Sequence, residues 1–439
     1  MRAERERFID VMRELLPGLL FAAALGLFAF RLAIPPRYVM DEVYHAFTAA
    51  QIVEGNPDVF NWNAKAPRAG VGYTWNHPPL GVLLIAGGVA IWGDGPFGWR
   101  FASALFGALG ATLGYLLAWR LTGHRTAGVL TALFLMLDTL YFTQSRIGML
   151  DIFGTVFMLA AFLFLHRTLV ARPAPRRADL MMTGLCLGAA IAVKWNAAYA
   201  TAVIAVVLLA RVARTGLSRR DGSPGESGAV FRREAAWILL AVGVVPTVVY
   251  VAAYTPFFAA GSGPREFLAL QEQIFRYHAG LQAAHDYASR WWQWPLTLRP
   301  VWYYVQYDPD GTVAHVYANG NPLLHWLFVP AVCAVLWAWR RRPPLPLILA
   351  VGFFGQWLPW ALVPRVAFVY HFLPAATFGC VALGIGIAAL LGAGRWRRTL
   401  GIAYAVAVLA AFVFFYPTSS AVPLTRQAIE ARMWLDSWR

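Results

Sequence analysis

Long apolar runs constrain this chain more than any other feature of its sequence. About eleven of them approach the roughly 20 residues that a helix needs to cross a bilayer. Hydrophobic residues make up 59% of the 439 residues and charged residues only 13%, which is far from the composition of an ordinary soluble domain. We therefore predict an all-α polytopic membrane protein with about eleven transmembrane helices, built as one integral-membrane domain over residues 1–439. The runs are 15–34, 99–119, 126–144, 150–167, 179–195, 197–211, 235–256, 322–339, 345–363, 374–392 and 399–416.

The net charge of +15 is carried largely by arginines in short segments between the apolar runs, such as Arg340-Arg341-Arg342. Arginines in such segments are typical of cytoplasmic loops, so the charge predicts contact with membrane lipids and no nucleic-acid partner. The three cysteines all lie within apolar runs, which predicts neither a disulfide framework nor a zinc cluster.

Four arginines within residues 1–14 precede the run 15–34, and no small-residue cleavage site follows it. This pattern predicts a signal-anchor with a cytoplasmic N-terminus. Alternating spans then place the segments 35–99 and 257–321 outside, together with the C-terminus. We expect a multi-pass protein of the plasma membrane with two long extracytoplasmic loops. Within the first loop, the apolar piece 82–92 is short for a span and is predicted to be interfacial or re-entrant.

Two adjacent carboxylates, Asp41 and Glu42, lie just after the first apolar run in a chain with only 22 acidic residues. Carboxylates beside a membrane boundary favour chemistry near the lipid headgroups. The alternative is structural, because Asp41 would also suit the N-cap of a helix over residues 42–53, with Glu42 at the positive end of the helix dipole. The residues alone leave both interpretations open.

Three basic side chains, Arg100, Arg146 and Lys194, lie near the ends of predicted spans on the same face as the acidic pair. Long cationic side chains at such places commonly reach out to headgroups, and Asp151 could merely cap the next helix. The alternative is a set of cations that holds an anionic lipid headgroup close to an acid. His77 precedes two prolines and could form only local hydrogen bonds.

The sequence has no Walker loop and no nucleotide-binding glycine fingerprint after a strand. A membrane enzyme of this kind would need its activated donor delivered in the lipid, which points to a lipid phosphate. The nine histidines show no helical metal-ligand spacing, so we predict no metal site and no certain cofactor, although a dependence on a divalent cation stays open.

Several collinear blocks, together covering nearly the whole chain, resemble the protein O-mannosyltransferase family of C-type integral-membrane glycosyltransferases. Each block is weak alone, but their order and number make the resemblance specific. They are Asp41-Glu42, His77-Pro78-Pro79-Leu80-Gly81, Arg100, Arg146 to Asp151, Lys194-Trp195, His285-x-Tyr287-x-Ser289, Trp294-Pro295-Leu296, Arg299-Pro300-x-Trp302-Tyr303, Gly320-Asn321-Pro322 and Phe368-x-Tyr370-His371-x-x-Pro374.

The resemblance implies the C-type glycosyltransferase (GT-C) fold, a polyprenyl-phosphate-mannose donor, a Ser or Thr acceptor on an exported polypeptide, and inversion at the anomeric carbon. It also implies that Asp41 and Glu42 form the catalytic centre, without fixing which of them is the base. The segment 257–321 is too short for the β-trefoil MIR domain of eukaryotic relatives, which suggests a compact bacterial form. The residues expected to bind the donor phosphate or sugar are Arg100, Arg146, Asp151, Lys194, His77, Tyr370 and His371.

Two other functions fit parts of the pattern. A related C-type enzyme could move another sugar, such as aminoarabinose to lipid A, but the late Trp-Pro-Leu and Arg-Pro-x-Trp-Tyr blocks argue against it. A lipid-linked sugar transporter or flippase would use Arg146 and Lys194 as pathway charges. The position of these charges near one face, together with the long external loops, disfavours a transporter or flippase.

Overall fold

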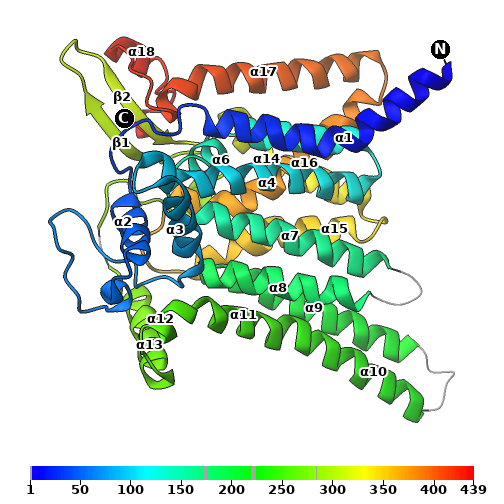
Figure 1. Ribbon diagram of the computed structural model, residues 1–439. Helices are drawn as coiled ribbons and strands as arrows, with labels where there is room; N and C mark the ends of the chain where they lie inside the picture. Colours follow the sequence, from blue (N-terminus) through cyan, green and yellow to red (C-terminus); the bar gives the residue numbers. More distant parts are fainter. Residues whose placement is uncertain (1, 172–175, 219–223, 283) are drawn as a thin grey trace.

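The computed structural model describes residues 2–171, 176–218, 224–282 and 284–439. Most of the helices run side by side along one axis and form a bundle (Figure 1). Two of the predicted arginine-rich connections include residues 172–175 and 219–223, which lie outside the described residues. The bundle consists of α1 (Arg2–Ala29), α4 (Pro96–Thr122), α5 (Arg125–Leu137), α6 (Thr139–Gln144), α7 (Asp151–Val170), α8 (Arg177–Val193), α9 (Ala197–Ser218), α10 (Pro224–Leu239), the π-helix η2 (Leu240–Val244), α11 (Val245–Ala253), α14 (Pro322–Trp339), α15 (Leu345–Trp357), α16 (Leu373–Leu391) and α17 (Arg395–Ser419).

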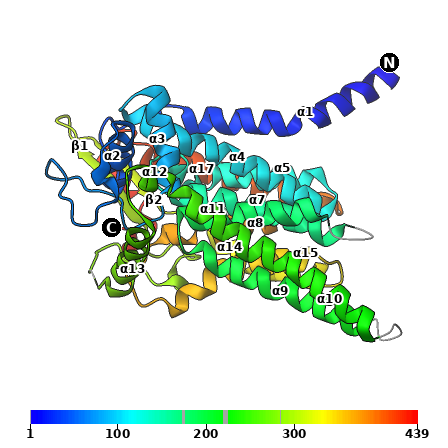
Figure 2. The ribbon, with the colours of Figure 1, turned by 60° about the horizontal axis from the view of Figure 1, so that its bottom comes forward.

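Shorter elements gather at one end of the bundle and form a cap (Figures 1 and 2). The C-terminus lies in this cap, and the N-terminus lies at the opposite end of the bundle (Figure 1). The cap contains α2 (Glu42–Val53), α3 (Leu80–Trp92), α12 (Thr255–Ala259), α13 (Pro264–Gly280), β1 (Val301–Tyr307), β2 (Val313–Ala318), α18 (Arg426–Glu430) and the 3-10 turns η1 (Pro57–Phe60), η3 (Trp291–Gln293), η4 (Leu358–Leu362), η5 (Val369–Phe372) and η6 (Asp436–Trp438).

The described residues contain 7 helices that are long and apolar enough to cross a membrane. Four shorter apolar helices accompany them, and α3 is one of these. The prediction of a mostly helical membrane protein is therefore confirmed, while the count of about eleven spans stays a prediction. The seven are Pro96–Thr122, Asp151–Val170, Phe231–Ala253, Pro322–Trp339, Leu345–Leu362, Val369–Leu391 and Arg395–Ser419.

The structure differs from the sequence predictions in two details, a β-hairpin in a fold predicted to be all-α and a break in one predicted span. The late external segment contains the antiparallel hairpin of β1 and β2, with a register shift between Trp302 and Tyr304. The run predicted over 126–144 is split into α5 and α6 at Asp138. The Asp138 carboxylate accepts hydrogen bonds from the backbone N–H groups of Leu140 and Tyr141, which caps α6 and ends α5.

Asp138 also ties the bundle together, because its Oδ1 accepts the backbone N–H of Asn321 at 2.9 Å and lies 3.1 Å from Nε2 of His325. The Asn321 amide donates to the carbonyls of Leu137 and Val408. Helices α5, α6, α14 and α17 thus meet at one buried polar point. Because each of these contacts satisfies a group that is buried away from water, the network fixes the relative position of four helices.

Close packing in the bundle depends on small residues where two backbones approach. A Cβ at Gly184 on α8 would lie 1.8 Å from the carbonyl oxygen of Ala241 in η2, which no side chain can tolerate without a shift of the backbone. The π-helical turn of η2 brings that carbonyl close to α8.

We predict that Gly184→Ala lowers the thermal unfolding temperature in detergent, with a loss of roughly 1–3 kcal/mol, as in other overpacked cores. Gly386→Ala on α16 is the matched control, because a Cβ there meets nothing within 4 Å. That variant should unfold at the wild-type temperature or slightly above it, since alanine favours a helix. Equal melting temperatures for the two variants would contradict the packing argument.

Candidate active site

The first loop places Asp41 in the cap through an unusual backbone conformation. Met40 has a φ of 49°, and its N–H donates to the carbonyl of Tyr303 in β1 at 3.1 Å. A positive φ is costly for a residue with a side chain and persists only where the surroundings impose it. The Asp41 backbone begins α2, but its side chain makes no capping hydrogen bond. The carboxylate of Asp41 is thus not engaged in the structural role that its position suggested.

Glu42 has a different environment. Its side chain is fully buried and forms a two-point ion pair with Arg100. Nε of Arg100 lies 2.7 Å from Oε1 of Glu42, and Nη2 lies 2.8 Å from Oε2. The backbone N–H groups of Val39 and Gly148 also donate to this carboxylate, each at 2.8 Å. Both oxygens are therefore occupied by protein partners.

Two of the expected phosphate ligands are directed towards backbone carbonyls. The remaining donors of Arg100 reach the carbonyls of Leu32, Pro35 and Arg37 at 2.8 to 3.1 Å. Arg146 donates to the last carbonyls of α1 and the residues just after it, which a helix end leaves without partners. Its partners are the carbonyls of Leu27, Phe28, Phe30 and Arg31.

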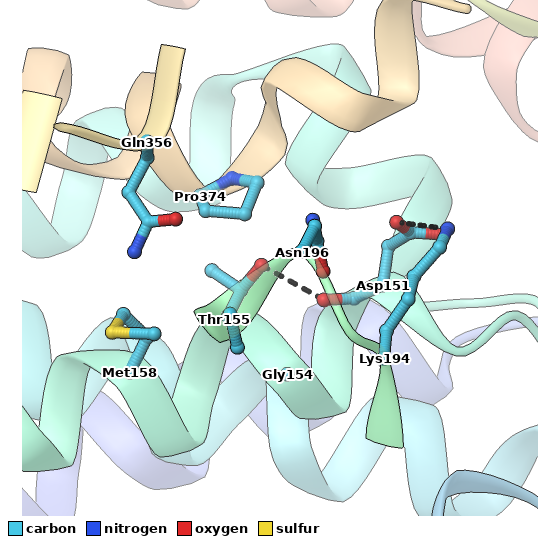
Figure 3. Close-up of a pocket in the computed structure, with 9 residues that line it drawn as sticks. Asp151, Gly154, Thr155, Met158, Lys194, Asn196, Gln356 and Pro374 are labelled. Atoms are coloured by element: carbon cyan, nitrogen blue, oxygen red, sulfur yellow. Dashed lines mark hydrogen bonds and ion pairs between the residues drawn. The ribbon is translucent and has the colours of Figure 1, made fainter. Parts of the chain in front are cut away.

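Lys194 and Asp151 form an ion pair across two helix ends. Nζ of Lys194, at the end of α8, lies 2.8 Å from Oδ1 of Asp151, the first residue of α7 (Figure 3). The same ammonium lies 5.4 Å from the centre of the Tyr370 ring. Oδ2 of Asp151 is buried and has no partner among the described residues. The pair holds the lysine in place, and 13% of the lysine side chain stays exposed.

A cavity of about 930 Å³ opens beside Lys194, within the range of pockets that bind small ligands and cofactors. Its lining combines cationic and histidine side chains with apolar residues of α8, α9, η2 and α11. A second cavity of about 10 Å³ lies behind Lys194 and is lined by Asp151, Thr155, Asn196 and Gln356 (Figure 3). It has room for about one water molecule. The basic and histidine residues that line the large cavity are His77, Lys194, His278, Arg365 and His371.

The electrostatics of the site link Asp41 to this ion pair. Burial raises the pKa of Asp41 from 3.8 to about 6, against the charge of Lys194, which lowers it, while the charge of Asp151 raises it further. Burial also raises the pKa of Tyr303, with smaller contributions from Asp151 and Asp41. Asp41, Asp151, Lys194 and Tyr303 therefore share one poorly solvated neighbourhood.

Burial lowers the pKa of three histidines of the cap, His45, His77 and His278. Burial, followed by the charge of Lys194, lowers the pKa of His45 to about 3 and that of His77 well below its usual value. His278 has a pKa of about 4 because of burial and the nearby charge of Arg365. Neutral imidazoles can each donate or accept a hydrogen bond. Among the described residues, no group of three or more His, Cys, Asp or Glu side chains is arranged to hold a metal ion.

The structure thus brings Asp41, His77, Asp151 and Lys194 to one place, together with the stacked rings of Tyr370 and His371, whose centres are 4.6 Å apart. Glu42, Arg100 and Arg146 hold the loop and helix ends around them.

Sequence analysis did not find Arg365, which contacts Nδ1 of His278 and lines the large cavity. It lies three residues before the block that starts at Phe368, and its only signal was a lone arginine between two apolar spans. Tyr303 was noted only as part of a block, although its carbonyl holds Met40.

A bundle of apolar helices with a carboxylate that lacks a hydrogen-bond partner, Asp41, close to the Lys194 that lines a large cavity, fits the class of integral-membrane enzymes that work at the membrane surface. Comparisons with known proteins narrow the class. Residues 18–260 match the family model described as dolichyl-phosphate-mannose-protein mannosyltransferase. Residues 264–438 match the C-terminal four-transmembrane region of protein-O-mannosyltransferase. The chain therefore belongs to the protein O-mannosyltransferase family.

Curated relatives agree with this assignment. The chain is 30% identical over 434 residues to a polyprenol-phosphate-mannose--protein mannosyltransferase of Mycobacterium tuberculosis, with 83% of this chain and 81% of the relative covered. It is 28% identical over 439 residues to the protein of the same name from Mycolicibacterium smegmatis, with 83% and 82% covered.

Solved structures show the same fold. A chain of the Saccharomyces cerevisiae Pmt1-Pmt2 complex bound to the sugar donor matches with a TM-score of 0.76 at 16% identity, covering 97% of this chain and 92% of that one. ArnT from Cupriavidus metallidurans bound to undecaprenyl phosphate matches with a TM-score of 0.58 at 18% identity, covering 90% and 70%. The family models and the curated relatives favour a protein mannosyltransferase over the alternative that moves another sugar.

We predict opposite effects on stability for the two neighbouring acids. Glu42→Gln leaves the buried guanidinium of Arg100 without its counter-charge and should cost about 3–5 kcal/mol, because breaking a buried ion pair strands the other charge. Asp41→Asn should unfold at the wild-type temperature or above, since burial already disfavours its ionised form. Thermal unfolding of both variants in detergent is the measurement. A marked loss in Asp41→Asn with none in Glu42→Gln would overturn the division of roles.

Proposed function

We propose that this protein transfers mannose from a polyprenyl-phosphate-mannose donor to Ser or Thr hydroxyls of exported polypeptides, with inversion at the anomeric carbon. One observation carries the proposal. The Asp41 carboxylate has no hydrogen-bond partner among the described residues, and it lies within the electrostatic reach of Lys194, which lines the large cavity.

Asp41 is the general base in this proposal. Its carboxylate accepts the proton of the acceptor hydroxyl while that oxygen attacks the anomeric carbon from the face opposite the phosphate. The bond from the anomeric carbon to the phosphate oxygen breaks, and the lipid phosphate leaves with the electron pair. General base catalysis contributes typically about 10²–10⁴-fold. Glu42 is unsuited to this step because Arg100, Val39 and Gly148 occupy both of its oxygens.

Lys194 and Arg365 are the cations that we assign to the donor phosphate. Both line the large cavity, and neither is enclosed by backbone carbonyls as Arg100 and Arg146 are. Fixed positive charge in a poorly hydrated site stabilises the negative charge that develops on the leaving phosphate. Asp151 positions Lys194, and His77, Tyr370 and His371 supply hydrogen bonds to phosphate or sugar.

The apolar part of the cavity suits the polyprenyl chain. Its lining includes Ile191 of α8, Ala198 of α9, Val242 of η2 and Pro246 of α11. A π-helical turn in a helix is often found at functional sites. A lipid tail between α8, α9 and α11 would place its phosphate beside Lys194 and Arg365.

We further propose about eleven spans with a cytoplasmic N-terminus and the cap outside the cell membrane, as the arginine-rich connections suggest. The separation of the two termini at opposite ends of the bundle supports an odd number of spans (Figure 1). In this orientation the site faces the exported polypeptide. No metal is assigned a role.

The direct test offers purified protein polyprenyl-phosphate mannose and a peptide with one Ser or Thr, followed by mass spectrometry of the peptide. We expect one added hexose, and a loss of at least about 100-fold in the rate for Asp41→Asn, as expected for removal of a general base. Asp58→Asn is the matched control, because this acid lies in the same external segment but is exposed. An unmodified peptide with folded protein, or full activity of Asp41→Asn, would refute the proposal.

The pH dependence follows from the pKa of Asp41. The carboxylate must be ionised to accept a proton, and its pKa is raised to about 6. We expect kcat/KM to be constant above that value and to fall about tenfold per pH unit below it, because only the ionised fraction is active. Initial rates between pH 4.5 and 8 at low substrate provide the profile. A flat profile across this interval would exclude Asp41 as the base.

A further inference from the structure

The hairpin of β1 and β2 has one closed edge and one open edge. On the outer side of β2, Val313 exchanges two hydrogen bonds with Leu424, and the carbonyl of His315 accepts the N–H of Ala421. The C-terminal segment therefore covers the edge of β2. β1 is the edge strand of this small sheet.

The backbone groups on the outer side of β1 can be assigned from the ladder. Asp308 donates to the carbonyl of Thr312 in the turn, and bonded and non-bonded pairs alternate along an antiparallel ladder. With Val305 paired to His315 and Tyr307 to Val313, the backbone groups of Val305 and Tyr307 point away from β2. In the part of the chain that the structure describes, neither residue has a backbone partner on that side.

This edge leads directly to Asp41. The carbonyl of Tyr303, the next residue but one before Val305, accepts the N–H of Met40, the residue before Asp41. Side-chain exposure rises along the strand, from 5% at Tyr303 to 39% at Val305 and 68% at Tyr307. Two residues of a strand span about 7 Å. The open edge thus runs from the surface of the cap to the proposed base.

The edge also lacks the devices with which proteins normally protect such strands. Residues 301–307 contain no charged residue and no proline, and the strand consists almost entirely of aromatic and β-branched residues. Exposed edges of this kind tend to pair with another extended chain unless charges, prolines or bulges prevent it. The single irregularity lies at Trp302 to Tyr304, at the buried end.

We propose that the acceptor polypeptide binds as an added β-strand on the outer edge of β1, alongside Val305 and Tyr307, with the Ser or Thr to be modified next to Asp41. This inference rests on the proposed function and concerns how its second substrate is held. Main-chain hydrogen bonds give affinity for any extended polypeptide, while its side chains point alternately to the two faces of the sheet. Such binding selects an unfolded segment with little regard to its sequence.

The test is a scan of Ser-containing acceptor peptides, each N-methylated at one position so that one peptide N–H is lost. Binding of fluorescent peptides by anisotropy and KM for transfer are both measured. The proposal predicts a period of two: methylation at residues that donate to β1 should raise Kd and KM about tenfold, while methylation at the residues between them should change neither by more than about twofold. Equal effects at consecutive positions, or no effect at any position, would overturn the proposal.

Variants of the protein give an independent readout. Val305→Pro removes an N–H that no described residue uses, so it should raise the KM for the peptide and leave the KM for the donor unchanged. Val305→Ala, which keeps that N–H, is the control and should retain a near wild-type KM for the peptide. Thermal unfolding of Val305→Pro checks that the hairpin persists, and the peptide scan needs no variant at all.

The proposed function and the proposed binding of the acceptor at the β1 edge can be refuted separately. Absence of transfer to any peptide refutes the proposed function, and the binding measurements still decide whether the edge holds peptides. Transfer to peptides without alternation in Kd or KM refutes the edge alone.

Discussion

The buried pair of Glu42 and Arg100 is the interaction on which the site depends. Removing two charges from water is expensive, and the cost is offset only where geometry is good and the other polar groups are satisfied. Here the guanidinium also takes carbonyls of the first loop, and the carboxylate also takes the N–H of Gly148. The pair therefore fastens the first loop, the start of α4 and the loop before α7 to one another. Asp41 immediately precedes Glu42 in the chain, so its backbone is held in place by this pair.

Asp41 and Glu42 carry the same chemical group, but their surroundings give them different roles. The carboxylate of Glu42 is paired with Arg100, whereas that of Asp41 has no hydrogen-bond partner, and burial raises its pKa to about 6. The cations divide in the same way. The guanidinium of Arg146 donates its hydrogen bonds to carbonyls at and just after the end of α1. Lys194 has a single carboxylate partner and lines an open cavity. The role of each charged group therefore follows from whether the fold already supplies its hydrogen-bond and ion-pair partners, and not from its residue type.

The sequence was sufficient for the helical membrane fold and for the face on which the polar residues gather. Apolar runs of the right length and arginines between them follow from the physics of the bilayer and are local signals. The roles of the charged residues were not predictable in this way, because their partners are distant in the chain. Arg100 is 58 positions from Glu42, and Gly148 is 106 positions from it. Backbone carbonyls, which decide the fate of Arg100 and Arg146, carry no sequence signature.

The hairpin did carry a local signal, since the β-prone residues 301–307 are followed by Asp308-Pro309-Asp310-Gly311, a strong turn sequence. Its significance lies in where it ends. Met40 bonds to β1 and then turns with a positive φ into α2, so that Asp41 lies where strand, helix and first loop meet. Lys194, whose charge acts on Asp41, lines the large cavity, and the open edge of β1 leads from Asp41 to the surface of the cap. A base between a lipid cavity and a strand edge can meet a hydroxyl on an extended chain from one side and a sugar on a lipid from the other. In-line displacement with inversion requires this arrangement.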